Sequence, residues 1–279
     1  MILEAAGWRA ALLPEKGVAF QSLTLDGHDV LKPIPGGADP NNGFHGAFLM
    51  APWTNRLEDG RIIVGGIDYR MPINRPAEGN ALHGFLRDLP WTAEEAAADR
   101  ATFRCTLVHA PFRCAARLSI ALSPAGFSLA VSLTNTGDAV TPMGFGWHPW
   151  FARRPGTRLR FAAATIFGRD ARNVATAPRP GSGLDGGDAV LDGHDTHFAG
   201  WDGLAEITWP DGTRLAIRAD GAWARNLQVF APAGGDVLCV EPVTHAPDAV
   251  NRAENAAHGA MHALPPGATL DASLMIHRL

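Results

Sequence analysis

The chain has 279 residues, of which 46% are hydrophobic and 19% are charged, and its formal net charge is -4. This composition describes a globular chain that can bury a sizeable core, as one large β domain or as two small ones. The slightly negative charge offers nothing to attract nucleic acid or an anionic membrane, and no apolar run approaches the roughly 20 residues that span a bilayer.

The N-terminus and the cysteines bear on compartment and metal binding. The first residues lack a basic segment followed by a long apolar one, so we predict no signal peptide and a cytoplasmic protein. Cys105, Cys114 and Cys239 make an odd count without a C-x-x-C spacing. Two of them could pair across neighbouring strands, but the spacing predicts neither a zinc motif nor a disulfide framework.

Segments with strand character dominate the first half of the chain. Ile62–Val64 and Ile67–Arg70 flank Gly-Gly, which favours a tight hairpin. Thr102–Val108 is also strand-like. Arg117–Leu122 and Phe127–Leu133 alternate apolar and polar residues, and the Ser-Pro-Ala-Gly between them predicts a second hairpin.

The second half follows the same pattern. Glu206–Trp209 and Arg214–Arg218 flank Pro-Asp-Gly-Thr, a strong hairpin signal because Asp-Gly accepts a positive φ. Three further segments have strand character: Asn226–Phe230, Val237–Glu241 and Thr269–His277.

Two segments depart from this pattern. Ala175–Asp195 is rich in Gly, Pro and Asp and is predicted to be a long surface loop. Asp248–Met261 is where a short helix is expected. Because no linker or second compositional regime interrupts the chain, we predict one all-β domain over residues 1–279. Its architecture should be two large, mostly antiparallel sheets packed together.

Two polar motifs occur in the first third of the chain. Arg56 stands in Asn-Arg-Leu, where its guanidinium could present a rigid fork of donors to hydroxyl or carboxylate oxygens. The alternative is a surface turn with a solvated arginine. His83 stands in Leu-His-Gly, and Gly84 permits an unusual backbone or the close approach of a ligand. His83 could donate to a sugar hydroxyl, whereas the alternative is a structural histidine.

A third motif surrounds His148 in Gly-Trp-His-Pro-Trp-Phe. Three large aromatic side chains around one histidine would form a dry pocket wall, and aromatic faces suit the C–H faces of a sugar. Pro149 is expected to stop strand pairing after His148. The alternative is a core histidine whose hydrogen bonds are satisfied.

The fourth motif contains Glu241, which ends the apolar run Val-Leu-Cys-Val and precedes Pro242. A partly buried carboxylate is costly unless it is paired or functional. The alternative is an edge-strand glutamate that faces water, and the apolar flanks favour the functional role. Pro242 leaves no backbone donor to continue the strand ladder.

Other polar groupings fit known site types poorly. His258 and His262 have a spacing that could hold a metal on a helix, but the residues around them do not match the zinc-protease pattern. The polar patch that runs from Asp192 to His197 lacks the register of a calcium loop and is interpreted as a flexible loop. We therefore predict no bound metal. The chain also lacks a serine-hydrolase elbow and a glycine-rich phosphate loop.

Taken in order, the four motifs and one more resemble the aldose 1-epimerase (galactose mutarotase-like) family. That family's pattern runs N-R-[IL], L-H-G, H-P-[YW]-F, an Asp near a Phe, and E-P before a polar turn. The matching sequences here are NRL at Asn55, LHG at Leu82, HPWF at His148, DTHF at Asp195 and EPVTHAPDAVN at Glu241. The match spans almost the whole chain, and five motifs in order are more specific than any one of them.

The resemblance implies a β-supersandwich that binds a sugar in an open groove on one sheet. It implies that Glu241 is the general base and His148 the general acid of mutarotation, the exchange of the α and β anomers of a free aldose. That reaction moves protons but no electrons, so it requires no cofactor.

The resemblance also places Arg56, His83 and Asp195 on the sugar hydroxyls. Asp192 and Asp202 remain alternatives to Asp195 because both are close to it in the sequence. The chain departs from the family at two positions: Phe85 replaces a second glycine after L-H-G, and Ala152 replaces the asparagine that often follows H-P-Y-F.

The expected partner is a small-molecule sugar, with the protein as a monomer or homodimer. We expect a neutral aldose to be preferred. One alternative is an anionic sugar such as a hexose 6-phosphate, because four arginines follow His148: Arg153, Arg154, Arg158 and Arg160. These arginines are more simply interpreted as solvated side chains of a strand. A second alternative is a non-catalytic sugar-binding protein, which would be expected to lack His148 or Glu241.

Overall fold

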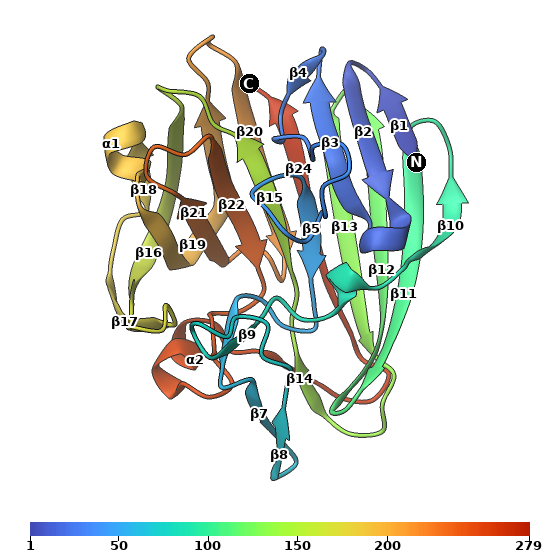
Figure 1. Ribbon diagram of the computed structural model, residues 1–279, viewed down its shortest axis with the longest axis vertical. Helices are drawn as coiled ribbons and strands as arrows, with labels where there is room; N and C mark the ends of the chain where they lie inside the picture. The colour runs from blue at the N-terminus through green and yellow to red at the C-terminus, as the bar shows by residue number, and fades with distance from the viewer.

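The computed structural model describes residues 1–279, and antiparallel strands make up most of it. Eighteen strands belong to one continuous sheet that folds over into two packed layers, with β2 and β3 in front of β12 and β13 in Figure 1. The first layer contains, in pairing order, β1 (Ile2–Ala5), β2 (Trp8–Leu13), β3 (Ala19–Leu25), β5 (Ala47–Met50), β15 (Gly146–Ala152), β22 (Val237–Val243) and β21 (Asn226–Ala231). The second layer contains β10 (Thr92–Ala96), β11 (Arg100–His109), β12 (Phe112–Ser123), β13 (Gly126–Asn135), β24 (Thr269–Arg278) and β20 (Arg214–Gly221).

One long strand, β19 (His194–Thr208), joins the two layers. Its first part pairs with β21 and its last part pairs with β20. Between these parts, Gly200 and Gly203 have φ angles of 66° and 82°, a conformation that residues with a Cβ rarely adopt. This bend carries the strand from one layer to the other. The neighbouring β16 (Arg158–Arg169) pairs with β19 on both sides of the bend.

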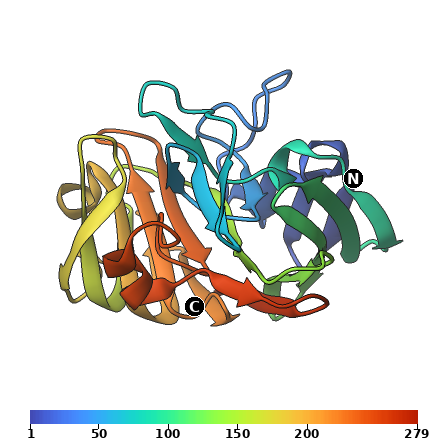
Figure 2. The same cartoon turned by 90° about the horizontal axis from the view of Figure 1, so that it is seen from below.

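Shorter elements border the layers, and Figure 2 views them from the end where the β7–β8 hairpin projects. The short strands are β4 (His28–Asp29), β6 (Arg56–Glu58), β7 (Arg61–Val64), β8 (Ile67–Arg70), β9 (Asn80–Leu82), β14 (Thr141–Met143), β17 (Ala175–Pro180), β18 (Leu184–Gly186) and β23 (His262–Leu264). The helices are α1 (Asp188–Leu191), α2 (Ala253–Gly259) and two 3₁₀ turns, Pro14–Lys16 and Leu86–Asp88. Neither α-helix has the length and apolar character needed to cross a lipid bilayer.

The main core lies between the layers and contains 60 buried residues in one cluster. Because side chains alternate along a strand, Trp147 and Phe151 of β15 enter this core while His148 and Trp150 face away. The Trp147 ring lies 5.8 Å from the ring of Phe20 in the first layer and 5.8 Å from that of Phe127 in the second. Trp147 therefore packs against both layers, on the opposite side of β15 from the neighbouring His148.

The all-β prediction and its hairpins are confirmed. The three predicted hairpins are β7–β8, β12–β13 and β19–β20, closed by the pairs Val64–Ile67, Ser123–Gly126 and Thr208–Arg214. The short helix expected within Asp248–Met261 is α2.

The prediction of a loop over Ala175–Asp195 is wrong. This segment forms β17, β18 and α1 and ends in the first residues of β19. Both short strands pair with β16 at the edge of the sheet. Pro178 and Pro180 are compatible with β17 because an edge strand has no neighbour on its outer side to require their missing N–H groups.

The expectation that Pro149 and Pro242 end strand pairing is also wrong. Pro149 pairs with Ala47 of β5, and Pro242 pairs with Leu227 of β21. The N–H of Trp150 donates to Gly46, away from β22, so the nitrogen of the preceding Pro149 points toward β22. The N–H of Thr244 donates to Phe145, and the nitrogen of Pro242, two residues earlier, points in the same direction, toward β15. Both proline nitrogens therefore face the boundary between β15 and β22. The pairing of β15 with β22 is interrupted at this boundary, between the pairs Gly146–Val243 and Trp150–Cys239.

The cysteines are all free and buried. Cys105 and Cys114 lie on the paired strands β11 and β12, but in diagonal positions, because Cys105 is opposite Ala116 and Cys114 is opposite Leu107. The disulfide that the sequence allowed across neighbouring strands is therefore not formed.

The position of Trp147 between the layers generates a stability prediction. Trp147→Ala should lower the free energy of unfolding by about 3–5 kcal/mol, because it leaves a cavity where the layers meet. Urea denaturation followed by circular dichroism would measure the change. Val108→Ala is the matched control, because Val108 is 71% exposed and its truncation should change stability by less than about 0.5 kcal/mol. A loss below 1 kcal/mol for Trp147→Ala would contradict this packing.

Candidate active site

The face of the first layer that points away from the main core carries two rows of side chains. Paired residues of antiparallel strands share a face, and so do residues two positions apart. The pairs Gly146–Val243 and Trp150–Cys239 set a register that puts His148 opposite Glu241. Continued onto β5 and β21, the first row is Phe48, His148, Glu241 and Gln228. The second row, two residues along each strand, is Trp150, Cys239, Phe230 and Asp195.

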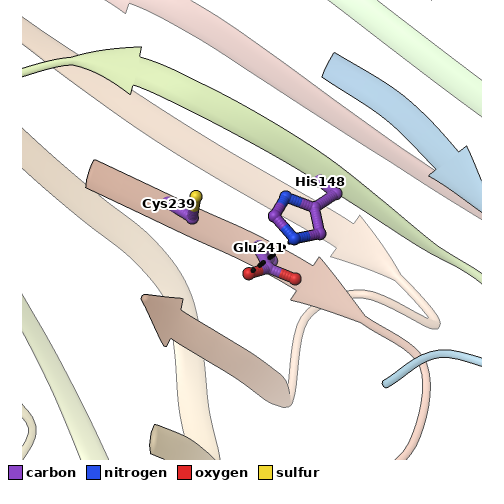
Figure 3. Close-up of side chains that lie close together, drawn as sticks. All are labelled: His148, Cys239 and Glu241. Carbon is purple, nitrogen blue, oxygen red and sulfur yellow. Dashed lines mark ion pairs between the residues drawn. The ribbon is translucent and has the colours of Figure 1, made fainter. Parts of the chain in front are cut away.

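His148 and Glu241 form a buried pair at the centre of the first row (Figure 3). His148 Nε2 lies 3.5 Å from Glu241 Oε1, and the two side chains are 8% and 2% exposed. His148 is paired with Phe48 of β5, and Glu241 is paired with Gln228 of β21. Such a pair can take a proton from one atom of a ligand and give one to another.

Two aromatic rings hold the imidazole of His148 in place. The ring of Phe48 lies 4.8 Å from it and that of Trp150 lies 4.7 Å from it, at interplanar angles of 31° and 29°. Nδ1 of His148 is buried without a hydrogen-bond partner. The other ring nitrogen, Nε2, faces Glu241.

Burial disfavours charge on both members of this pair. Desolvation raises the pKa of Glu241 well above its usual range, and the nearby charge of Asp195 adds to the shift. Desolvation also lowers the pKa of His148 to about 3. Both shifts favour the neutral forms of the two side chains. Protonated Glu241 beside neutral His148 holds the same number of protons as ionised Glu241 beside protonated His148. The two residues therefore titrate as a unit.

An ion-pair cluster forms the edge of the pocket beside this pair. Arg56 donates to both carboxylate oxygens of Glu78, with distances of 2.7 Å from Nε and 3.1 Å from Nη2. Its Nη1 lies 3.3 Å from Asp195 Oδ2, which also lies 3.0 Å from Arg169 Nη1. Gln228 donates to the other oxygen of Asp195 at 2.8 Å. Arg56 and Asp195 are thus held in fixed positions from which they can bind hydroxyl groups.

His83 enters the pocket from a strained backbone. Its φ is +66°, and the neighbouring Gly84 has a φ of +68° and lies tightly against the backbone of Ala51. Its Nδ1 accepts a hydrogen bond of 3.2 Å from the N–H of Asn55, so the proton is on Nε2. Burial lowers the pKa of His83 well below its usual range, which keeps the ring neutral and makes Nε2–H a hydrogen-bond donor.

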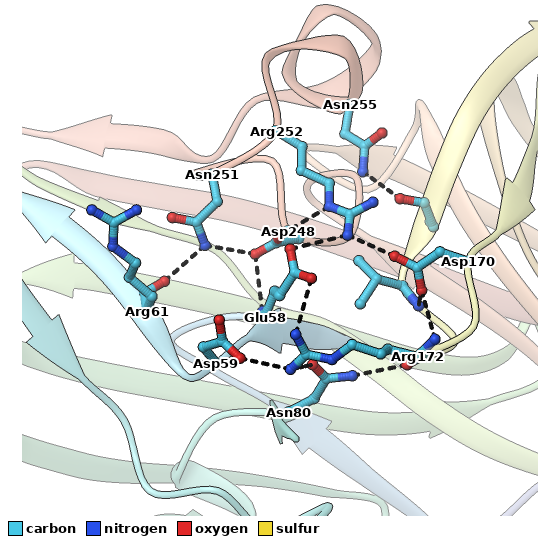
Figure 4. Close-up of polar contacts among 12 residues, drawn as sticks. Glu58, Asp59, Arg61, Asn80, Asp170, Arg172, Asp248, Asn251, Arg252 and Asn255 are labelled. Atoms are coloured by element: carbon cyan, nitrogen blue, oxygen red, sulfur yellow. Dashed lines mark hydrogen bonds and ion pairs between the residues drawn. The ribbon is translucent and has the colours of Figure 1, made fainter. Parts of the chain in front are cut away.

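A polar network outside the pocket supports the strand that carries Arg56 (Figure 4). Glu58, two residues along β6, lies 3.1 Å from Arg172 and 3.0 Å from Arg252. Arg172 also donates to the backbone oxygen of Glu78 at 2.8 Å, and Arg252 lies 2.7 Å from Asp170. Charges from three distant parts of the chain therefore fix both Arg56 and its partner.

The five residues predicted from the sequence meet at one cavity of about 340 Å³. This volume lies within the range of small-ligand sites. Arg56, His83, His148, Asp195 and Glu241 all line it. Sequence reasoning did not single out several other lining residues: Phe48, Arg75, Glu78, Arg87, Gln228 and Phe230. Arg87 had a recognisable signal, since it is a charge within the apolar segment that follows L-H-G.

The alternatives raised by the sequence lie elsewhere. Asp192 binds Arg153 at 2.6 Å and Asp202 accepts from a backbone N–H of its own turn, so neither lines the cavity. The four arginines after His148 are all paired with Asp residues outside it: Arg153, Arg154, Arg158 and Arg160. Arg153 is buried rather than solvated as expected.

The histidines that resembled metal ligands are also separated from one another. His258 lies in α2, whereas His262 begins β23. Beside the cavity, ligand atoms of His148, Cys239 and Glu241 lie within 4.8 Å of one another (Figure 3). Burial raises the pKa of the Cys239 thiol well above its usual range.

A family model and two curated proteins resemble this chain in sequence. A family model described as aldose 1-epimerase matches residues 3–277. The uncharacterized protein YphB of Escherichia coli K12 is 26% identical over 246 residues, which is 79% of each chain. The uncharacterized protein YihR of the same organism is 29% identical over 150 residues, covering 52% of this chain and 48% of YihR.

Two solved structures share the fold over the whole chain. A putative aldose 1-epimerase from Escherichia coli K12 superposes with a TM-score of 0.85 at 22% identity, covering 100% of this chain and 98% of that one. A galactose mutarotase-like protein from Clostridium acetobutylicum superposes with a TM-score of 0.87 at 19% identity, covering 100% and 94%. The similarity confirms the predicted supersandwich.

Burial of Glu241 generates a prediction about stability. Because the pKa of Glu241 is raised in the folded state, this residue binds a proton more tightly in the folded chain than in the unfolded one, and its contribution to stability falls as pH rises above about 4.5. Glu241→Gln cannot titrate, so at pH 8 it should be more stable than wild type. The gain should shrink toward pH 4.

Chemical denaturation at several pH values would measure this difference. Glu15→Gln, a change at an exposed residue, is the control for loss of one carboxylate. If Glu241→Gln were instead less stable than wild type at pH 8, the carboxylate would be ionised and stabilised in the folded state, contrary to its burial.

Proposed function

The chain belongs to the aldose 1-epimerase family, and we propose that it is a mutarotase that interconverts the α and β anomers of a free aldose. The observation that carries this proposal is the buried contact of 3.5 Å between His148 and Glu241, at the base of a cavity lined by hydrogen-bonding groups. Anomer exchange needs one group to accept a proton from the anomeric hydroxyl and another to protonate the ring oxygen.

The ring opens in one coupled step. The Glu241 carboxylate removes the proton from the anomeric hydroxyl, the C1–O1 bond becomes a carbonyl, and the C1–O5 bond breaks. His148 gives its proton to the departing ring oxygen O5, so that O5 leaves as a neutral hydroxyl. The product is the open-chain aldehyde, and the pair still holds one proton, now on Glu241.

The ring then closes on the other face of the carbonyl. Rotation about C1–C2 turns the aldehyde over, O5 attacks C1, His148 takes back the O5 proton and Glu241 returns its proton to O1. A raised carboxylate pKa makes Glu241 a stronger base, and a lowered imidazole pKa makes protonated His148 a stronger acid. Hydroxyl groups of a bound sugar would favour the charged pair by donating to the carboxylate.

The remaining predicted residues hold the sugar. Arg56 and His83 present N–H donors, and Asp195 presents acceptor oxygens, from positions fixed by their own partners. Such matched polar groups select against sugars that lack the corresponding hydroxyl. Trp150 and Phe230 belong to the second row and supply apolar surface for the C–H faces of the ring.

The test is the rate at which a freshly dissolved pure anomer equilibrates, followed by polarimetry or NMR. Purified protein should accelerate equilibration, whereas Glu241→Gln and His148→Asn should each lower kcat by about 10²–10⁴-fold, because each removes a proton transfer. His262→Gln is the control, because His262 lies outside the cavity. Sugar binding without acceleration by the wild-type protein would instead support a non-catalytic binding protein.

The role of Asp195 can be separated from that of its sequence neighbours. Asp195→Asn should lower kcat/KM by about 10–100-fold, since hydrogen bonds to a charged group contribute about 1.5–3 kcal/mol. Asp192→Asn and Asp202→Asn should leave kcat/KM within about twofold, because neither residue lines the cavity. Steady-state kinetics on the preferred aldose would decide, and a larger loss for either control would show that the sugar binds elsewhere.

A further inference from the structure

Cys239 adds a third metal-ligand side chain to the pair of His148 and Glu241 (Figure 3). A ring nitrogen, the thiol sulfur and a carboxylate oxygen, one from each residue, all lie within 4.8 Å of one another. The contact between His148 Nε2 and Glu241 Oε1 is 3.5 Å. Nitrogen and oxygen ligands at about 2.0–2.2 Å from a tetrahedral zinc ion are about 3.4 Å apart, so this pair already has the spacing of zinc ligands.

The sheet holds the three side chains on one face. Cys239 and Glu241 are two residues apart on β22, so they point to the same side, and His148 lies on the adjacent strand β15. All three residues are buried. His148 and Glu241 line the cavity, which gives an ion a path to them. A metal at this point would therefore be bound by strands rather than by a loop that must first close.

The chemistry of the three side chains favours zinc over magnesium or calcium. Thiolate and imidazole ligands suit Zn²⁺, whereas Mg²⁺ and Ca²⁺ prefer oxygen. Three protein ligands also leave one position of a tetrahedral ion open to water. Burial raises the pKa of the Cys239 thiol, so zinc must displace its proton to the solvent. A coordinated metal does this directly, because its charge replaces that of the proton on the sulfur.

We propose that His148, Cys239 and Glu241 bind Zn²⁺, and that the bound ion inhibits mutarotation by occupying both residues of the proton-transfer pair. The inhibition rests on the proposed mutarotase function, whereas the binding does not. The sequence-based prediction of no bound metal considered ligands that are close in the chain, such as His258 and His262. This site was missed because β15 and β22 bring together residues from distant parts of the chain.

The first test measures metal binding by the full chain, with calorimetric titration of Zn²⁺ and absorption spectroscopy of Co²⁺. Wild-type protein should bind one equivalent of either ion, and the cobalt form should show a thiolate-to-cobalt charge-transfer band. Cys239→Ala and Cys239→Ser should abolish the band and weaken binding at least about tenfold, since even changes outside the ligand shell cost about 10–100-fold. Cys114→Ala, at a buried cysteine of β12, is the matched control and should keep both.

Two results of the binding test would overturn the site. One is the lack of a one-equivalent site or of the charge-transfer band in the wild-type protein. The other is binding that both Cys239 variants retain at full affinity. Mg²⁺ should not compete with zinc, because it prefers oxygen ligands.

The second test follows anomer exchange by NMR as Zn²⁺ is added. Without zinc, Cys239→Ala should keep kcat within about twofold of wild type, because Cys239 does not line the cavity. Its inhibition should require at least about tenfold more Zn²⁺. Equal inhibition of both proteins, or none in the wild type, would overturn inhibition through this site and leave the mutarotase function in place. Zinc binding through Cys239 without acceleration of any sugar would overturn the mutarotase function and leave the metal site in place.

Discussion

The antiparallel register between β15 and β22 is the constraint on which the site depends. It places His148 opposite Glu241 and, by strand alternation, turns Trp147 and Val240 into the core between the layers. A slip of one residue would exchange the two faces, bury the catalytic candidates in the main core and expose its tryptophan. The nitrogens of Pro149 and Pro242 face this boundary and cannot donate hydrogen bonds across it. The register of β15 and β22 is therefore maintained mainly by side-chain packing on both faces of the layer.

Around this pair the fold holds ionisable groups where water cannot solvate them. Burial pushes the pKa values of Glu241 and His148 in opposite directions, and His83 stays neutral for the same reason. The raised pKa of Glu241 suits a general base near neutral pH, although burying ionisable groups reduces the stability of the fold. The ion pairs of Arg56, Arg172 and Arg252 offset part of this effect at the rim, where matched charges replace the lost water.

Sequence reasoning succeeded where structure is specified locally. The hairpins follow from turn residues between alternating segments, and the motifs of Arg56, His83, His148 and Glu241 gave residues that meet in one cavity. Sequence reasoning failed where contacts between distant parts of the chain decide the local structure. Pro178 and Pro180 fit a strand only because β17 lies at a sheet edge, and Pro149 fits only because of the direction of its nitrogen. Arg75, Glu78 and Gln228 could not be assigned to the cavity, because contacts between residues distant in sequence place them there.

The bend in β19 has a consequence for how the chain reaches its native state. Because this strand belongs to both layers, neither layer is complete without it, and strands as distant in sequence as β13 and β24 must also pair. Folding therefore requires many long-range contacts, a topology associated with slow folding and with exposed strand edges during synthesis. The neighbouring β15 and β22 come from distant parts of the chain, so a nascent chain lacks the His148–Glu241 pair until nearly all of it has emerged from the ribosome.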